Sequence, residues 1–554
     1  MTAAYNLRTL IFMGVCGVGF LALGLVLFLN DSMIMQMKMR FQKVIIGYNT
    51  WLTPVDMVFK FYLFHVNNPE GVMQGETPIF TEKGPYVYAE TVERQILSID
   101  EESDEIVFMT RSMFAFNKRE SGNVTEDDKV TILNPAYLGT INTVKVSLLI
   151  KYLAALSADF LKQFGDSIAK LFPPSSVVFV SGKAGDILFS GMKFTCNSKK
   201  YSELKMICST LESNKPPIVI DGPKAGTYFY SFFQKINSTL RGPYRVKRGV
   251  TNYKEVGTIS MYQGKRIQKI WDTKPCNTVN GSDGITWAPM PMEILDMVSL
   301  FSPDTCRYLI PKLHPSSFFS HSTLYSFKFY IVSGISLYTL TSKTWEPDEI
   351  DCYCPQTPDG KVCLPKGILD IGQCQELPIF LSEPHFMHGD PALLQYAQGL
   401  KPQESIDGHQ SYVIIEPLTG APLSGFRRTQ LSIKLSRHAT VELLQNVSEG
   451  YFPLLWCEEV HVEFFHAFLT GKNSGAACAS APVPGDSSVA PRLVHAADTA
   501  DYRRVPSPDD FVRMRNSKAQ DTSDQHREGI IGSVTGFFCQ NDATRPTQAT
   551  STPL

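Results

Sequence analysis

The cysteines are the residues of this chain whose spacing carries the most chemical information. The chain has 554 residues and 12 cysteines, and six of these fall within a stretch of about 100 residues. They are Cys276, Cys306, Cys352, Cys354, Cys363 and Cys374. Six clustered cysteines that follow an N-terminal apolar segment predict three disulfides formed in an oxidising compartment. Spacing alone does not determine which cysteines pair.

A zinc site is the competing interpretation of the last four of these cysteines. Thiolates are good zinc ligands, but this group lacks the paired Cys-x-x-Cys spacing of structural zinc sites. Disulfides therefore remain the favoured prediction. Apart from Cys16, which lies in the apolar segment, 11 cysteines remain, and an odd number predicts at least one thiol that is free or intermolecular.

Patterns that would support catalysis are absent or incomplete. The sequence has no His-Glu-x-x-His and no Gly-x-Ser-x-Gly, and the glycine-containing stretch 257–265 has the wrong loop length for binding a nucleotide. His385 and His388 are spaced like two metal ligands, but no third ligand lies nearby in the sequence, so we interpret them as structural. We predict that the chain is not an enzyme and uses no cofactor or metal.

Composition excludes two classes of protein. Apolar residues make up 43% of the chain, which is typical of a folded protein rather than a disordered one. The 52 Lys and Arg residues are balanced by 54 Asp and Glu residues, so no broad basic field exists to bind nucleic acid. The aromatic content of 11% favours β-sheets and large apolar cavities.

Residues 10–29 predict a transmembrane helix, because 20 uncharged residues span about 30 Å as a helix. The segment is longer than the apolar core of a signal peptide and no cleavage site follows it, so we expect it to be retained. Residues 1–9 are then cytoplasmic, and the chain from residue 30 onward lies outside. Four Asn-x-Ser/Thr sequons of this outer part are candidate glycosylation sites. They are Asn123, Asn237, Asn280 and Asn446.

Residues 30–460 consist mostly of short apolar runs separated by turns, which predicts β-strands. Several of these runs are apolar on both faces and must be covered on both sides or line an apolar interior. They include residues 217–220, 227–233, 325–332 and 412–418. Residues 144–172 differ, since apolar residues at spacings of three and four predict an amphipathic helix. This helix packs on the β body or forms an exposed platform for ligands.

The last part of the chain, residues 461–554, is rich in Ser, Thr, Asp, Ala and Pro and predicts a disordered tail. Its longest uncharged stretch, residues 529–541, has 13 residues and is too short to cross a bilayer.

Several motifs between residues 5 and 460 resemble those of one family. They are Lys83-Gly-Pro-Tyr-Val-Tyr88, Phe301-Ser-Pro-Asp-Thr-Cys306-Arg307, Cys352-Tyr-Cys354, Pro384-His-Phe386, Ile414-Ile-Glu-Pro-Leu-Thr-Gly420 and Pro453-Leu-Leu-Trp456. Together with the N-terminal anchor and the six-cysteine spacing, they are similar to the class B scavenger receptors. That family includes platelet glycoprotein IV (fatty acid translocase), lysosomal integral membrane protein, insect sensory neuron membrane proteins and croquemort-like receptors.

The resemblance implies a mainly β fold, an antiparallel β-barrel ectodomain with an apolar tunnel and an apical helical bundle at residues 144–172. It implies the disulfides Cys276–Cys352, Cys306–Cys374 and Cys354–Cys363. At the apex, Lys162 and Lys170 are the expected contacts for anionic ligands, with Phe160 and Phe164 beside them.

The resemblance also implies a function. We predict a plasma-membrane receptor that binds lipids, lipoprotein-like particles or anionic phospholipid surfaces and transfers fatty acids, sterols or carotenoids through its tunnel. The alternatives are a trafficking receptor for a lysosomal enzyme, on a lysosomal or endosomal membrane, and a phagocytic receptor for apoptotic or microbial surfaces. Association with further copies of the same chain, as a homo-oligomer, is an additional alternative. The family has a second transmembrane helix near its C-terminus, and residues 461–554 contain no such segment, so we expect a variant form or a receptor held by one anchor.

Overall fold

The computed structural model describes residues 55–461, apart from 142–165, 214–217, 273, 291–294, 314–317, 324–329, 341–352, 355, 358–359, 376, 406–407, 418–419 and 440. The predicted transmembrane helix and nearly all of the predicted tail lie outside the described residues. The chain separates into two compact units, 1–479 and 480–554, and every described residue belongs to the first. In the part of the chain that is described, no helix is long and apolar enough to cross a membrane.

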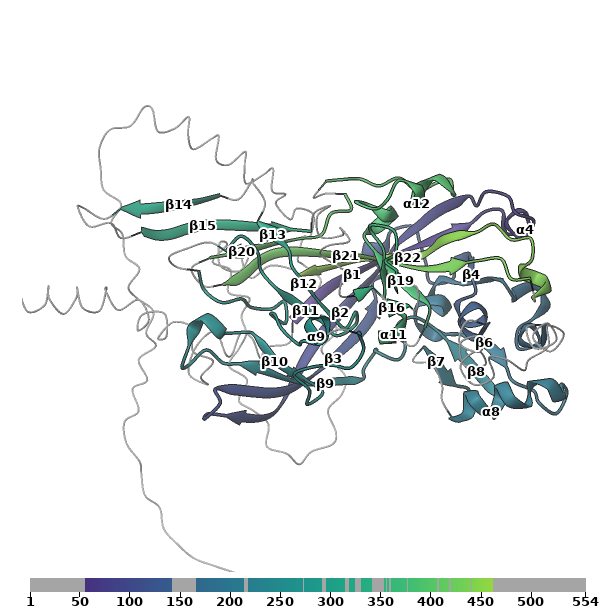
Figure 1. Cartoon of the computed structure of the whole chain (residues 1–554), viewed down its shortest axis with the longest axis horizontal. Coiled ribbons are helices and arrows are strands. Elements are labelled where there is room, and N and C mark those ends of the chain that lie inside the picture. Colours follow the sequence, from purple (N-terminus) through teal and green to yellow (C-terminus); the bar gives the residue numbers. More distant parts are fainter. Residues whose placement is uncertain are drawn as a thin grey trace, which may run out of the picture. The chain divides into compact units, whose positions relative to one another are not determined.

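An antiparallel sheet of 13 strands organises the described residues (Figure 1). Its strands are β1 (Val55–Val66), β2 (Phe80–Asp100), β3 (Glu105–Phe116), β9 (Leu240–Lys247), β10 (Ile259–Tyr262), β13 (Lys312–Leu313), β14 (Phe318–Thr323), β15 (Tyr330–Thr339), β18 (Leu369–Asp370), β19 (Ile379–Ser382), β20 (Tyr412–Glu416), β21 (Ala421–Leu435) and β22 (Gly450–His461). The predicted mainly β, antiparallel class is therefore confirmed.

The strand order places the two ends of the chain's β region side by side. It runs β10-β9-β3-β2-β1-β22-β21-β20-β15-β13, so the first strand pairs with the last one described. β14 pairs with β15, and β19 pairs with both β18 and β21. Among the described strands, β10 and β13 at the two ends of this order do not pair with each other.

Local sequence explains how the long strands begin and turn. Asp100 ends β2, and its carboxylate accepts hydrogen bonds from the backbone N–H groups of Glu102 and Ser103 at 3.1 and 3.0 Å, a pattern that stabilises the turn into β3. In the Lys83-Gly-Pro-Tyr motif, β2 approaches β1 so closely that a Cβ at Gly84 would lie 2.7 Å from the Phe61 carbonyl oxygen. Only glycine fits that position without displacing the backbone.

Smaller sheets and short helices complete the described region. The sheets are β4 (Lys129–Leu133) with β5 (Phe179–Lys183), β6 (Met192–Thr195) with β8 (Thr227–Tyr230) and β7 (Val219–Asp221), β11 (Leu300–Ser302) with β12 (Arg307–Leu309), and β16 (Gln356–Thr357) with β17 (Gly360–Lys361). The helices are α4 (Pro69–Met73), α5 (Lys118–Ser121), α8 (Lys205–Ser213), α9 (Lys274–Asn277), α11 (Gly372–Gln375) and α12 (Ala392–Gln395). One large core cluster joins residues of β1, β4, β5, β6, β8 and β22.

One predicted strand is shorter than expected. The apolar run 227–233 predicted a continuous strand, but β8 ends at Tyr230. Beyond it, the backbone N–H groups of Phe232 and Phe233 donate to the carbonyl oxygens of Ile187 and Leu188 at 3.2 and 2.9 Å. The backbone N–H groups of Phe232 and Phe233 therefore bond outside the sheet and are not available to pair with a neighbouring strand, so β8 ends before them.

Candidate ligand-binding cavity

One face of the large sheet lines a cavity of about 380 Å³. Successive side chains of a strand point to opposite faces, so alternate residues of five strands reach it. They include Met57 and Phe59 of β1, Glu90 and Val92 of β2, Ser112 and Phe114 of β3, Arg427, Thr429 and Leu431 of β21, and Cys457 and Glu459 of β22, while Phe426 and Arg428 of β21 also contribute. Pockets for small molecules are typically about 300–1,000 Å³, so this one has the size of a ligand site.

Aromatic and aliphatic side chains form most of the cavity wall. Phe59 lies with its ring centroid 5.7 Å from that of Phe114 and 6.4 Å from that of Phe233. A second apolar group contributes Leu369, Ile371, Leu377, Ile379 and Leu381. Such a wall stabilises an acyl chain by about 0.8 kcal/mol for each methylene that it removes from water.

A charged patch interrupts the apolar wall. Phe59, Glu459 and Arg427 lie opposite one another on β1, β22 and β21, and Arg427 and Glu459 form an ion pair. Close by, Arg241 Nη1 lies 2.9 Å from Asp304 Oδ1. The Asp304 charge raises the pKa of Arg241. Burial raises the pKa of Asp304, but Arg241 and Arg427 outweigh it and keep that pKa below its usual range. Both guanidinium groups therefore face a carboxylate inside the cavity.

Glu90 belongs to the same patch and differs from the other carboxylates. Its side chain lines the cavity and the residue is only 5% exposed. Its Oε2 atom accepts no hydrogen bond from any described residue. Burial, and then the charge of Glu459, raise the pKa of Glu90 to about 7, although a side-chain hydrogen bond with Ser112 and the charges of Arg427 and Arg241 offset part of this rise. The carboxyl group therefore changes protonation state near neutral pH.

Cys457 is an unpaired thiol at the cavity wall, and its Sγ lies 3.6 Å from the Thr429 carbonyl oxygen. Burial raises the pKa of Cys457 to about 12. The odd number of cysteines predicted at least one unpaired thiol, and Cys457 fits that prediction. Since the thiolate is the reactive form, the group stays protonated and slow to react at neutral pH.

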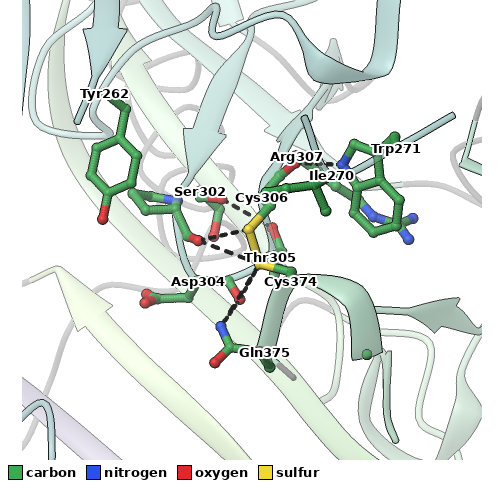
Figure 2. Close-up of a disulfide and its surroundings, with 12 residues drawn as sticks. Tyr262, Ile270, Trp271, Ser302, Asp304, Thr305, Cys306, Arg307, Cys374 and Gln375 are labelled. Carbon is green, nitrogen blue, oxygen red and sulfur yellow. Dashed lines mark hydrogen bonds between the residues drawn. A yellow bond between two sulfur atoms is a disulfide. The ribbon is translucent and has the colours of Figure 1, made fainter. Parts of the chain in front are cut away.

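The Cys306–Cys374 disulfide holds one edge of the cavity (Figure 2). It ties the turn between β11 and β12 to α11, and Asp304 lies within that turn. The Gln375 side-chain amide donates to the Asp304 carbonyl oxygen, and Trp271 Nε1 donates to the Cys306 carbonyl oxygen at 2.8 Å. The disulfide and these bonds fix the position of the carboxylate that faces Arg241.

The other cysteine pairs follow the resemblance where the chain is described. Cys354 is joined to Cys363, as the resemblance implies. Cys276 is disulfide-bonded, and its expected partner Cys352 lies outside the described residues. Cys354, Cys363 and Cys374 are thus engaged in disulfides, which rules out the alternative zinc site. Sequence reasoning left Cys196 and Cys208 unassigned, and the structure joins them 12 residues apart.

The opposite face of β21 and β22 carries a second polar group, which we call the buried polar network. It consists of Lys60, Glu82, His385, Arg428, Trp456 and Glu458. Arg428 Nε and Lys60 Nζ each lie 2.7 Å from a different carboxylate oxygen of Glu458. Glu82 Oε2 accepts from Trp456 Nε1 at 2.7 Å and lies 2.8 Å from His385 Nε2. These hydrogen bonds lower the pKa of Glu82 against the effect of its burial.

His388 lies between two carboxylates. Its Nδ1 is 2.6 Å from Glu383 Oε2 and its Nε2 is 3.0 Å from Glu404 Oε1, so both ring nitrogens are placed to donate. Burial lowers the pKa of His388, but Glu383 and then Glu404 outweigh it and raise that pKa. Among the described residues, no group of three or more His, Cys, Asp or Glu is placed to hold a metal ion.

The predicted apical residues are only partly described. Phe160, Lys162 and Phe164 lie outside the described residues. Lys170 is exposed, forms an ion pair with Glu203 and lies 5.4 Å from the Tyr201 ring centroid. The periodic positions Ile168 and Leu171 of the same stretch are both 1% exposed, so this end of it packs on the core.

The sequon asparagines lie at or near the surface. Asn123, Asn280 and Asn446 are exposed. Asn237 is half-buried, and its side-chain oxygen accepts from the Phe114 backbone N–H at 3.1 Å. Glycosylation of all four remains a prediction.

Sequence reasoning missed the charged patch of the cavity. Glu90 occupies a position of β2 where alternation with Tyr86 and Tyr88 predicts an inward side chain. The doublet Arg427-Arg428 lies in the middle of β21, and the doublet Glu458-Glu459 lies in the largely apolar β22. Adjacent residues of a strand point to opposite faces, so two neighbouring like charges in a buried strand place one charge on each face. This pattern could have predicted a charged group on the cavity face.

The fold and the cavity define a class: a disulfide-linked, mainly antiparallel β protein whose large sheet lines an apolar cavity with one charged patch. The model of the CD36 family matches residues 10–472. Sensory neuron membrane protein 2 of Manduca sexta is 34% identical over 422 residues, which cover 74% of this chain and 77% of that protein. Sensory neuron membrane protein 1 of Apis mellifera is 33% identical over 411 residues, 73% of each chain. The chain belongs to the CD36 family, the class B scavenger receptors.

Family membership confirms the predicted resemblance and extends it to residue 472, beyond the expected limit near residue 460. At the level of the family, this is a membrane-associated receptor that binds ligands of the lipid type, and it is not an enzyme family.

Proposed function

We propose that this chain is a cell-surface scavenger receptor that takes lipid from particles or membranes and passes it through the cavity of its ectodomain. The cavity is the observation that carries the proposal, because alternate side chains of β1, β2, β3, β21 and β22 converge on it. Its wall is mainly apolar and carries one charged patch, which suits a molecule with a long apolar chain and a polar head. In the proposal, closure of the sheet completes a tunnel that leads toward the membrane.

Capture of lipid is proposed to begin at the apical residues Phe160, Lys162, Phe164 and Lys170. Exposure of Lys170 supports such a role, but its ion pair with Glu203 neutralises part of its charge. The double variant Lys162→Glu/Lys170→Glu should therefore lose most of its binding to vesicles rich in anionic phospholipid. The control is Lys265→Glu/Lys269→Glu, which makes the same charge change at exposed positions of the β10 region. Unchanged vesicle binding by the apical variant would contradict this part of the proposal.

Transfer through the cavity is tested by filling it. Cells expressing the full chain are given a fluorescent cholesteryl ester or a fluorescent fatty acid, and uptake is normalised to the amount of receptor on the surface. Thr429→Trp and Val92→Trp each place an indole into the cavity, whereas Ser98→Trp places one at an exposed position of β2. We expect both cavity variants to lose uptake and the control to retain it. Full uptake by surface-expressed cavity variants would overturn the proposal.

A further inference from the structure

Glu90 has a carboxylate oxygen in the cavity that lacks a partner. The residue is 5% exposed, it lines the cavity, and its Oε2 atom accepts no hydrogen bond from any described residue. Buried carboxylates normally have their acceptor sites filled by donors of the protein or by ordered water. An unfilled acceptor on a residue that lines a cavity is therefore a candidate site for a hydrogen bond from a ligand.

The cations near Glu90 already face other carboxylates. Arg427 forms an ion pair with Glu459, and Arg241 Nη1 lies 2.9 Å from Asp304 Oδ1. Glu90 interacts with both guanidinium groups only as a more distant charge. The charged patch therefore contains two ion pairs, Arg427 with Glu459 and Arg241 with Asp304, and one further carboxyl group, that of Glu90.

Arg241 also has an unused atom. The residue lines the same cavity, and its buried Nε finds no acceptor among the described residues. Arg241 and Glu90 are close enough to influence each other electrostatically. At the charged patch, Arg241 thus offers an unused donor and Glu90 an unused acceptor, and elsewhere on the wall Thr110 and Trp287 also carry buried polar atoms without a partner among the described residues. A hydroxyl group can use the donor of Arg241 and the acceptor of Glu90, since it donates one hydrogen bond and accepts others.

We propose that Glu90 and Arg241 recognise the uncharged polar head of a lipid, so that the cavity prefers a long-chain alcohol to the fatty acid of the same length. The inference rests on the proposed function and deepens it by naming the ligand class. The alcohol O–H donates to Glu90 Oε2, and its oxygen accepts from Arg241 Nε. A carboxylate has no proton to donate, and it brings a further negative charge beside Glu90 and Glu459.

Preference for the alcohol should depend on pH. The titratable or charged groups that line the cavity around Glu90 are Glu459 and Cys457 of β22, Arg427 and Arg428 of β21, Arg241 of β9, Arg94 of β2, Asp304 of the β11–β12 turn, Asp283 and Glu383. Glu90 loses its charge as the pH falls, which removes its repulsion of a carboxylate. It can then donate its own proton, so the alcohol remains bound. Acid binding should therefore rise at low pH while alcohol binding changes little.

The test measures binding of two lipids that differ only in the head group. The full chain is immobilised in detergent and incubated with tritiated hexadecanol or hexadecanoate, and the Thr429→Trp variant gives the background. At about pH 8.5 we expect hexadecanol to bind roughly tenfold more tightly, which corresponds to one pK unit of differential interaction. At about pH 6 the ratio should fall at least roughly threefold as Glu90 becomes protonated.

Variants assign the effect to Glu90. Glu90→Gln removes the charge and keeps the shape, so it should gain hexadecanoate binding and bring the two lipids within about twofold at both pH values. Glu90→Leu cannot accept a hydrogen bond and should lose hexadecanol binding. Glu101→Gln, at an exposed position of the β2–β3 turn, should behave like the unaltered chain.

The outcomes separate the two proposals. If neither lipid binds the unaltered chain above background, both the proposed function and this inference are overturned. If both lipids bind equally well, or if Glu90→Gln keeps the full preference, the cavity still binds lipid but the assignment of Glu90 is wrong.

Discussion

The two faces of β21 and β22 use the same residue types for different purposes. Arg427 and Glu459 form an ion pair at the cavity, whereas their neighbours Arg428 and Glu458 pair with each other in the buried polar network, although Arg428 also contributes to the cavity lining. In that network both carboxylate oxygens of Glu458 have cationic partners at 2.7 Å. At the cavity, Glu90 keeps an oxygen without a described partner.

This difference distinguishes the buried polar network, which stabilises the fold, from the charged patch of the cavity, which is available to a ligand. A buried polar network is stable only when its members are satisfied. The network around Glu458 meets that condition, so removing any member should mainly reduce stability. At the charged patch of the cavity, some polar atoms have no partner among the described residues. Removing a member of this patch should therefore mainly change lipid binding.

The largest effect should follow from breaking the buried polar network. Glu458→Ala leaves Arg428 and Lys60 without their carboxylate, and removing one partner of a buried ion pair costs about 3–5 kcal/mol. Chemical unfolding of the full chain, followed by tryptophan fluorescence, measures this loss. Glu459→Ala, one residue away on the cavity face, should cost clearly less because the Arg427 side chain is 37% exposed. Equal costs would remove the distinction between the two faces.

The second effect concerns the disulfide at the cavity edge. The pair Cys306→Ser/Cys374→Ser should lower the free energy of unfolding by about 2–4 kcal/mol and weaken lipid binding, because Asp304 loses its support. The control is Cys354→Ser/Cys363→Ser, whose cysteines are 9 residues apart rather than 68. Loss of the shorter loop should cost less stability and leave lipid binding intact. Identical binding losses in both variants would show that the disulfide acts through stability alone.

A third effect uses the unpaired thiol as a reporter of the cavity. Cys457 should react slowly with a small maleimide at neutral pH, because burial raises its pKa to about 12. Bound hexadecanol should slow the reaction further, by roughly tenfold if the lipid fills the cavity at about ten times its dissociation constant. Mass spectrometry of the peptide that contains Cys457 measures the rate. A rate that is insensitive to lipid would place the bound lipid elsewhere.

The smallest effect should come from His388, away from the cavity patch. Its pKa is raised in the folded protein by Glu383 and Glu404, so its contribution to stability is complete below its unfolded pKa and is lost as the pH rises through the folded value. The gap in melting temperature between the unaltered chain and His388→Gln should shrink between about pH 6 and pH 9. We expect at most about 1 kcal/mol, since Glu404 is 73% exposed.

A histidine with the opposite shift provides the control for this last experiment. Burial, and then Lys83, lower the pKa of His65. His65→Gln should therefore show no such loss of stabilisation as the pH rises. A gap for His388→Gln that stays constant across the range would mean that folding leaves the pKa of His388 unchanged, which contradicts the account.

Sequence reasoning reached the fold class because the apolar runs are local signals and because the motifs and cysteine spacing carried a family resemblance. The apolar runs gave antiparallel strands, and Cys306, Cys374, Cys354 and Cys363 pair as the resemblance implied. The end of β8 at Tyr230 was missed because tertiary hydrogen bonds from Phe232 and Phe233 decide it. The cavity patch was missed because it joins Glu90, Arg241 and Glu459 from distant strands, and only the strand order brings them together.

The central claim is that lipid occupies the cavity, and covalent mapping tests it most directly. The full chain is irradiated with a hexadecanol analogue that carries a diazirine at the end of its chain, and the labelled residues are located by mass spectrometry. The account predicts adducts on cavity-lining residues such as Phe59, Phe114 and Phe233, and their loss in Thr429→Trp. Adducts confined to exposed apolar residues such as Leu97 and Val362, which are 50% and 53% exposed, would contradict it.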